Sequence, residues 1–310
     1  MRVLFLGSND LKKYNKGHQL FKNKIGKYWN VLFYGQDHIH NGTNKVPDIV
    51  NKYGPFDLIM TYHYKRCGCY EGMREVDIKK VHFVMDYVPK IEGIDQAVNY
   101  DQIRLSEIVF RKHEYDLFFA LNVDAKKRMI ENGFNNIFVL PFCVDIDWFV
   151  PGANSKSIDI IFPATRWLSL YERRESIKIY LDSMGKYKVN TRKFTGQSYI
   201  NTLGTAKILV NSLNRWNTLN YKILEGMSCG AMLLTEPPFD LDLSEIKDGE
   251  HLVLFEGIED MRKKIDYYLK NDSEREKIAK AGQKFVRENH NTDVRAKQMI
   301  EIVERELFNG

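Results

Sequence analysis

Residues 221–234, with the sequence YKILEGMSCGAMLL, combine residue types that could bind a nucleotide. The segment predicts a short helix that ends near Gly230 and leads at once into a buried strand. Glu225 lies within this helix, where its carboxylate could accept two hydrogen bonds from a vicinal diol such as a ribose. Free amides at the start of the helix, near residues 219–221, suit a phosphate group. The alternative is that Glu225 is a solvated side chain on a tightly packed helix.

A second group of reactive side chains is formed by His63, Cys67 and Cys69, with the spacing H-x3-C-x-C. A zinc site commonly uses about four ligands in spaced pairs, and no second pair follows. We therefore expect two reduced thiols in a glycine-containing turn and no bound metal. With Cys143 and Cys229 the chain has 4 cysteines, which do not make a disulfide framework in 310 residues.

Length and composition limit the class of protein. The 310 residues suggest two domains of about 150 residues each, and 44% hydrophobic with 28% charged residues indicates a folded protein. No apolar stretch approaches the ~18 residues of a membrane span. The N-terminal MRVLFLGSND is typical of a buried strand and turn rather than a signal peptide, so we expect a cytoplasmic protein. The net charge of +5 is compatible with an anionic ligand but does not indicate nucleic acid.

Short apolar runs alternate with longer amphipathic segments along the chain. This alternation predicts an α/β protein with parallel sheets. The predicted strands are residues 1–7, 29–34, 56–61, 81–85, 117–121, 137–140, 158–163, 207–212, 231–235 and 252–255. The predicted helices are residues 99–112, 124–132, 171–184, 221–228, 259–270, 274–289 and 293–307, and Gly133 is expected to cap the second of them.

The pattern restarts after a linker at residues 151–155 (PGANS). We therefore predict two α/β domains, residues 1–152 and 153–292, that face each other across a cleft. Ligands of open α/β sheets bind beyond the carboxyl ends of the strands. The site is expected in the loops at residues 7–11, 61–66, 86–90, 164–171, 211–220 and 236–241.

The second half of the chain also resembles a known family. Glu225, Cys229-Gly230 and Leu233-Leu234 match an E-x-x-x-C-G-x-x-L-L core. Further matches are Asp248-Gly249, Phe255, Tyr267-Tyr268-Leu269, Arg275, Ile278-Ala279, Gly282, His290 and Arg295. Residues 158–300 thus resemble GT-B glycosyltransferases of the retaining group-1 type, and their spore-maturation (CgeB-like) branch in particular. In the first half the resemblance rests on residues 140–145, where Cys143 replaces the usual Gly.

The resemblance implies a GT-B fold with two Rossmann-like domains, and transfer of a sugar from a nucleotide-sugar donor, UDP-sugar by preference, to a hydroxyl acceptor. Glu225 would hold the donor ribose. Many relatives have another Glu eight residues earlier, where this chain has Asn217, so the donor sugar and turnover itself stay open. Arg173 and Arg174 would stabilise the leaving diphosphate. The alternative is that both arginines lie on a solvated helix face. The other donor-binding residues implied are Thr218, Leu219, Asn220, Arg166, Tyr171 and, near the base, Gly196.

The first half is expected to hold the acceptor. His63 and Asp86 follow predicted strands, and Asp86 stands where many relatives carry a His. In an inverting enzyme either side chain could take the acceptor proton, whereas in a retaining enzyme both would only orient groups. A structural role is the alternative for each of them. Tyr62, Tyr64 and Tyr87 are aromatic candidates for a sugar site.

The resemblance further implies catalysis without a metal or another cofactor, because arginines and backbone amides near Leu219 would stabilise the leaving diphosphate. It also implies that the last helix, within residues 293–310, packs back on the first domain. Two other functions stay open. Basic residues such as Lys24 and Lys126-Lys127-Arg128 suggest an enzyme that glycosylates a hydroxylated DNA base. Asn217 suggests a non-catalytic GT-B-like protein that binds a sugar nucleotide.

Overall fold

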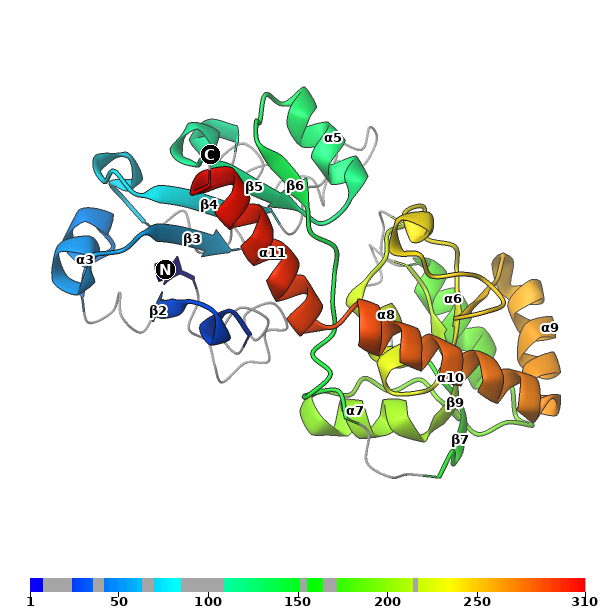
Figure 1. Cartoon of the computed structure of the whole chain (residues 1–310). Coiled ribbons are helices and arrows are strands. Elements are labelled where there is room, and N and C mark those ends of the chain that lie inside the picture. The colour runs from blue at the N-terminus through cyan, green and yellow to red at the C-terminus, as the bar shows by residue number, and fades with distance from the viewer. Residues whose placement is uncertain are drawn as a thin grey trace. The chain divides into compact units, whose positions relative to one another are not determined.

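The computed structural model describes residues 1–7, 24–35, 42–62, 70–84, 109–150, 155–163, 172–213 and 217–309, without the side chains of Tyr62, Asp242 and Leu243. The chain forms two compact units (Figure 1). Unit 1 comprises Met1–Pro141 and Arg295–Gly310, and unit 2 comprises Phe142–Val294. Within the described ranges, no helix combines the length and the apolar character needed to cross a membrane.

Unit 1 is built on a six-stranded parallel sheet with the order β2-β1-β3-β4-β5-β6. Its strands are β1 (Arg2–Leu6), β2 (Asn30–Tyr34), β3 (Leu58–Tyr62), β4 (Lys79–Val84), β5 (Leu117–Ala120) and β6 (Ile137–Val139). Successive side chains of a strand point to opposite faces. Val3 and Phe5 accordingly join one buried cluster while Leu4 and Leu6 join another, which is why β1 is apolar from Val3 to Leu6.

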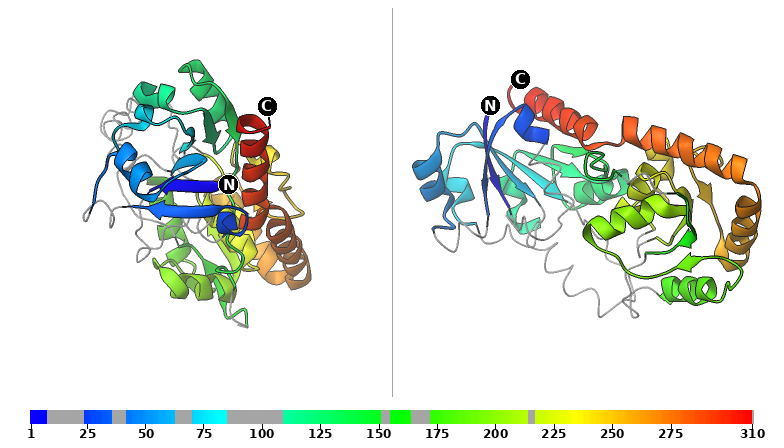
Figure 2. Two further views of the ribbon diagram at one scale, coloured as in Figure 1. Left: turned by 60° about the vertical axis from the view of Figure 1, so that its left-hand side comes forward. Right: turned by 90° about the horizontal axis from the view of Figure 1, so that it is seen from below.

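Helices cover both faces of this sheet. They are α3 (Val46–Tyr53), α5 (Val123–Glu131) and α11 (Thr292–Leu307), with short 3-10 helices at Ile25–Lys27, Met73–Glu75 and Lys112–Glu114. Ala296, Met299, Ile300 and Val303 of α11 have the spacing of one helix face and pack on the cluster that contains Val3. The last helix thus belongs to the core of unit 1, and both chain ends lie in this unit (Figure 2).

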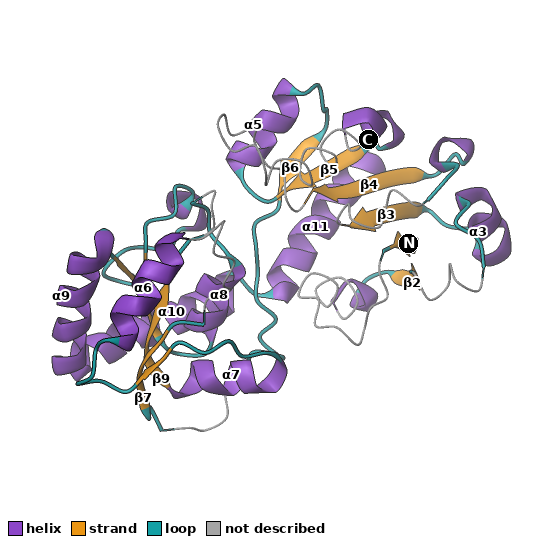
Figure 3. Cartoon of the chain, turned by 180° about the vertical axis from the view of Figure 1, so that it is seen from behind, coloured by secondary structure: helices purple, strands orange, loops and turns teal. Residues whose placement is uncertain are grey.

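Unit 2 contains a five-stranded parallel sheet with the order β11-β10-β9-β7-β8. Its strands are β7 (Ile158–Ile161), β8 (Val189–Asn190), β9 (Ala206–Asn211), β10 (Met232–Thr235) and β11 (Val253–Leu254). Its helices are α6 (Glu172–Asp182), α7 (Gly196–Thr205), α8 (Tyr221–Ser228), α9 (Gly257–Lys270) and α10 (Asp272–Asn289). Figure 3 shows these helices around the strands of the unit. A 3-10 helix spans Leu241–Ser244. The strand order reverses between β7 and β9.

The secondary structure agrees closely with the sequence pattern. Each of the ten predicted strands is present, with ends within two residues of those expected, and the helix at Tyr221–Ser228 is found as predicted. Gly133 follows α5 with φ of 74°, and the amide of Phe134 donates to the carbonyl of Met129, as expected for a glycine C-cap. Most of the helix predicted over residues 99–112 lies outside the described residues.

Residues 142–150 belong to unit 2, whereas the sequence pattern placed the boundary after residue 152. Val144 pairs with Asn291 in an isolated bridge, and its amide donates to the carbonyl of His290 at 2.9 Å. The ring of Phe149 meets Tyr199 edge to face, with centroids 6.4 Å apart. Hydrogen bonds and packing therefore tie this segment to unit 2 before the glycine-containing linker begins.

Candidate functional site

Glu225 lies within α8, on a stretch from Ile223 to Ser228 that is buried throughout. A side chain at Gly226 would put a Cβ 2.0 Å from Cδ2 of Leu209, so this glycine lets α8 lie directly against β9. Glu225 is 1% exposed, which rules out the solvated alternative. Burial of a carboxylate is costly unless hydrogen bonds compensate, and here Oε2 accepts a hydrogen bond from the hydroxyl of Tyr199 at 2.8 Å.

Tyr199 comes from α7, a helix that the sequence pattern did not predict. The helix begins at Gly196, whose φ of 58° lies in the left-handed region that favours glycine. Tyr199 follows one turn later and is buried. The helix that begins at Gly196, the residue expected near the base, is thus connected to Glu225 through a hydroxyl-to-carboxylate hydrogen bond, a contact that no local pattern indicated.

Cys229 follows α8 and is also buried. Burial raises the pKa of its thiol to about 12, and the negative charge of Glu225 adds to the rise. Nζ of Lys156 donates to the carbonyl of Gly230 at 2.8 Å. The thiol is therefore protonated at neutral pH and contributes by packing rather than as a nucleophile.

The two arginines at the start of α6 have different environments. Arg174 is buried, and its Nη2 donates to the carbonyls of Ser212 and Leu213 at 3.3 and 3.0 Å. The side chain of Arg173 is 50% exposed. Neither residue therefore forms a purely solvated helix face. Arg174 fixes the segment after β9, and Arg173 is the one of the pair that is accessible to a ligand.

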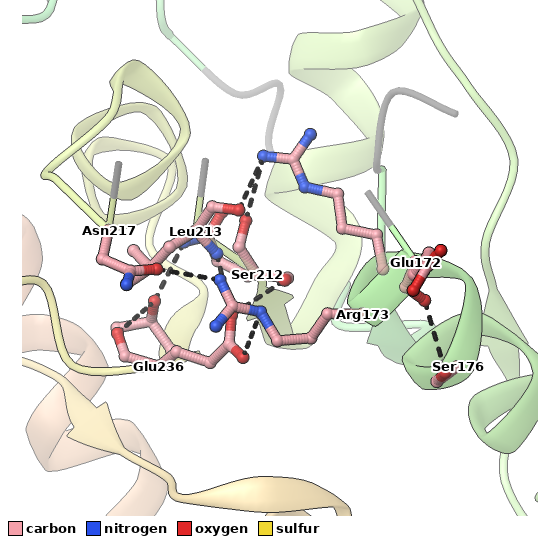
Figure 4. Close-up of polar contacts among 10 residues, drawn as sticks. Glu172, Arg173, Ser176, Ser212, Leu213, Asn217 and Glu236 are labelled. Carbon is pink, nitrogen blue, oxygen red and sulfur yellow. Dashed lines mark hydrogen bonds and ion pairs between the residues drawn. The ribbon is translucent and has the colours of Figure 1, made fainter. Parts of the chain in front are cut away.

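Arg173 is held between two side chains from other loops (Figure 4). Its Nε lies 3.0 Å from Oε1 of Glu236 in an ion pair, and its Nη2 donates to Oδ1 of Asn217 at 2.9 Å. Oε2 of Glu236 accepts hydrogen bonds from the Ser212 hydroxyl at 2.8 Å and the Leu213 amide at 2.9 Å. Glu236 was not named among the predicted site residues, but it is the first residue of the loop 236–241 in which the site was expected.

Asn217 has a left-handed backbone, with φ of 53°. Asn is one of the few residues with a side chain that adopts this conformation readily. The carbonyl of Asn217 accepts a hydrogen bond from the amide of Phe239 at 2.9 Å. The backbone thereby connects the loop before α8 to the loop after β10, and the side chain is directed to Arg173.

The segment before α8 contains the predicted phosphate-binding residues Thr218, Leu219 and Asn220. The amide of Leu219 donates to Oδ1 of Asp240 at 2.7 Å, so this amide is engaged by the protein itself. Asn220 is the N-cap residue of α8, and its extended backbone (φ −133°, ψ 164°) places its carbonyl to accept the Ile223 amide. Asp240 was not named as a site residue but lies within the predicted site loop 236–241, and it shapes the start of the helix.

These contacts gather where parallel sheets bind ligands. Arg173 is near the start of α6, Ser212 and Leu213 follow β9, and Glu236 follows β10. They lie at the carboxyl ends of the strands, next to the β7–β9 position where the strand order reverses. In open α/β sheets this switch point is where ligands bind.

Metal ligands were sought among the same residues. No group of three or more His, Cys, Asp or Glu side chains that could hold a metal occurs in the described part of the chain. Two Asp-x-Asp sequences begin at Asp145 and Asp240. Oδ1 of Asp145 accepts the amide of Asp147 at 3.1 Å, and Oδ1 of Asp240 accepts the amide of Leu219. The first carboxylate of each sequence therefore binds backbone amides.

Several predicted site residues lie outside the described residues: His63, Asp86, Arg166 and Tyr171, together with Cys67, Cys69, Tyr64 and Tyr87. Of the basic residues considered for DNA contact, Lys24 is only 3% exposed. Arg128 forms an ion pair with Asp124 at 2.7 Å on the same helix. These two residues therefore do not form a free basic surface.

Comparisons with known proteins agree with this fold. A protein-family model described as "Glycosyl transferase-like" matches residues 166–301. A search of curated protein sequences finds no match.

Among solved structures, sucrose-phosphate synthase from Thermosynechococcus elongatus is similar over 100% of both chains, with 13% identity and a TM-score of 0.72. Anabaena HepE in complex with UDP-glucose is similar over 98% of this chain and 100% of its own, with 12% identity and a TM-score of 0.70. An alpha-glucosyltransferase in complex with UDP-glucose and DNA containing an abasic site is similar over 98% of this chain and 99% of its own, with 12% identity and a TM-score of 0.65.

Both units have the parallel α/β architecture of the GT-B fold, which confirms the predicted fold class, and the family match covers most of unit 2. The structure therefore defines a protein of the GT-B fold, in which residues 166–301 match a glycosyl transferase-like family model.

Proposed function

We propose that this protein is a glycosyltransferase, which transfers a sugar from a UDP-sugar to a hydroxyl group of its acceptor without a metal ion. The observation that carries the proposal is the cluster of Arg173, Asn217 and Glu236 at the switch point of the unit 2 sheet, beside the helix that contains Glu225. A guanidinium there can bind phosphate oxygens. A carboxylate on the neighbouring helix can bind a diol.

Each residue has a distinct role in this proposal. Glu225 accepts hydrogen bonds from the ribose hydroxyls, in an orientation that Tyr199 supports. Arg173 binds the diphosphate and stabilises the negative charge that develops on it as the glycosidic bond breaks. Asn217 binds a hydroxyl of the donor sugar through its amide.

The remaining donor-site residues support this arrangement. Thr218 and Asn220 lie at the start of α8, where backbone amides favour a phosphate, and Leu219 contributes by fixing that segment to Asp240. Arg174 contributes through the loop that it anchors. Gly196 begins the helix beside the base. Arg166 and Tyr171 stay predictions for the donor, as His63 and Asp86 do for the acceptor.

Two finer points belong to the proposal. Uridine is the expected base because similar structures, such as HepE, contain UDP or UDP-glucose. We place the chain in the spore-maturation branch because of the E-x-x-x-C-G-x-x-L-L core at residues 225–234 and the D-G step at Asp248-Gly249.

Thermal unfolding with a panel of nucleotides tests the choice of base. A ligand that binds only the folded state raises stability by mass action, by about 2.7 kcal/mol at a hundredfold excess over its Kd. UDP is expected to raise the Tm more than GDP, ADP or TDP at equal concentration. A larger effect of another nucleotide would replace uridine in the proposal, and no effect of any would remove the nucleotide site.

Replacement of the buried carboxylate tests the site itself. Glu225→Gln keeps the size of the side chain but removes its charge, and loss of a charge-assisted hydrogen bond costs about 1.5–3 kcal/mol, or about 10- to 100-fold in affinity. Isothermal titration with UDP measures this loss. Glu259→Gln, which changes a carboxylate paired with Arg262 on α9, is the control and is expected to bind normally. Equal UDP affinity in Glu225→Gln would exclude Glu225 from the donor site.

Turnover separates a transferase from a protein that only binds the sugar nucleotide. Release of UDP from UDP-glucose, followed with and without candidate acceptors, is expected to depend on Arg173. UDP-glucose binding without any release or transfer would favour the binding protein. A steep loss of activity with salt would favour a DNA acceptor, because phosphate contacts release counterions.

A further inference from the structure

Glu236 is a buried carboxylate whose contacts converge on one arginine and one loop. Its relative exposure is 8%. Oε2 accepts from the hydroxyl of Ser212 and from the amide of Leu213, which fixes the carboxylate to the end of β9. Oε1 is left to face Nε of Arg173 at 3.0 Å. The side chain is therefore immobilised on one side and presents a defined acceptor on the other.

Arg173 is oriented by two acceptors that come from different loops. Glu236 binds Nε, and Oδ1 of Asn217 binds Nη2 at 2.9 Å, as Figure 4 shows. Its third nitrogen, Nη1, makes no hydrogen bond to any residue that the structure describes. A guanidinium is planar, so fixing two of its nitrogens also fixes the direction of the third. The half-exposed side chain thus has one orientation rather than many.

The charges of this cluster support the same conclusion. Arg173 and Glu236 form one neutral pair, and Asn217 adds an acceptor without adding charge. A carboxylate at position 217 would place the guanidinium between two negative groups. The amide instead leaves its own Nδ2 as a donor, because Oδ1 is occupied by Arg173.

We propose that Glu236 is a positioning residue, which holds Arg173 so that Nη1 meets the diphosphate of the donor. The identity of the ligand in this inference rests on the proposed function. The orientation of Arg173 rests on the structure alone. Arg173 is then already ordered when the ligand binds. Immobilising a flexible side chain on binding would cost roughly 0.5–1.5 kcal/mol, or about two- to tenfold in affinity.

Glu236→Gln is the informative substitution. Oε2 of Glu236 accepts two hydrogen bonds and Oε1 pairs with the guanidinium of Arg173, so an amide must turn its NH2 group toward one of these donors. The Leu213 amide belongs to the backbone, and the guanidinium of Arg173 is the partner that can move. The variant is expected to release Arg173 and to weaken UDP binding by about tenfold.

Two readouts distinguish positioning from a general structural effect. In a double-mutant cycle measured by titration with UDP, Glu236→Gln should have no further effect once Arg173→Ala is present. In the ligand-free protein, NMR relaxation of the Arg173 Nε–H signal should show a rigid side chain, and a mobile side chain is expected in Glu236→Gln. Glu259→Gln breaks an arginine pair on α9 and should change neither readout.

Multiplicative losses in the double variant, or an unchanged Arg173 signal in Glu236→Gln, would overturn the proposal. If Glu236→Gln does not fold, Arg173→Lys provides the same test. Lysine keeps the charge but cannot bind Glu236 and Asn217 in a planar fork, so UDP affinity should fall as in Arg173→Ala. Wild-type affinity in Arg173→Lys would also overturn the proposal. Failure of the wild-type protein to bind UDP would contradict the proposed function, whereas the NMR signal decides the positioning role independently.

Discussion

Arg173 and Arg174 are neighbours in sequence but face different surroundings. Successive residues of an α-helix are rotated by about 100°, so one arginine of α6 points to the loop after β9 and the other to Glu236 and Asn217. The sequence indicated a functional basic pair. The structure divides that pair into a buried anchor, Arg174, and an accessible side chain, Arg173.

The two arginines should therefore differ in their effects on stability. Arg174→Met removes both donors to the carbonyls of Ser212 and Leu213, and buried unsatisfied groups cost about 1–3 kcal/mol. Arg173→Ala breaks a half-exposed ion pair, which contributes about 1 kcal/mol or less. Urea unfolding followed by circular dichroism measures both. Equal losses of unfolding free energy in the two variants would contradict the assignment of Arg174 as the anchor and Arg173 as the accessible side chain.

The elements of the fold follow from local patterns, whereas parts of the site do not. Apolar runs identify the strands because each strand is covered on both faces. Residues 46–53 and 196–205 were not predicted as helices: the first contains Pro47 and only 8 residues, and the second begins with Gly196. The segment around Glu225 was recognised by residue type and spacing. The ion pair between Arg173 and Glu236 joins segments that are distant in sequence, so no spacing in the sequence indicates it.

Close packing of α10 against the turn before β11 makes Gly282 difficult to replace. A Cβ on Gly282 would lie 2.1 Å from the carbonyl oxygen of His251, and a backbone atom cannot move aside as a side chain can. Gly282→Ala is expected to reduce the free energy of unfolding by about 1–3 kcal/mol, the usual range for overpacking. Gly185→Ala is the matched control, because nothing lies within 4 Å of its Cβ position. The prediction fails if both variants unfold at the same urea concentration.

The two units differ in how the chain builds their cores. Unit 2 is one continuous segment, Phe142–Val294, and its main apolar cluster comes entirely from that segment. The core of unit 1 includes Ala296, Met299, Ile300 and Val303, which are distant in sequence from its sheet. The whole molecule therefore contains one unit that is complete in sequence and one that depends on the last helix.

Fragments should reflect this difference. Residues 142–294 expressed alone are expected to unfold cooperatively and to bind UDP, because the proposed donor residues all come from that segment. Residues 1–141 alone are expected to lack a cooperative transition, because one face of their sheet loses its helix. Thermal unfolding by circular dichroism and titration with UDP are the measurements. A stable fold of residues 1–141 would show that α11 is dispensable for unit 1.

The return of α11 to the first unit also sets an order of events during protein synthesis. A ribosome releases residue 294 before the apolar side chains of the last helix, so the second unit possesses its complete core first. Until α11 is synthesised, Val3, Phe5 and their neighbours in the sheet of the first unit lack the helix that covers them. The last strand of that sheet ends at Val139, and Ala296 is synthesised 157 residues later. At about 5–20 residues per second, this interval lasts on the order of ten seconds, during which a chaperone has an apolar surface to protect.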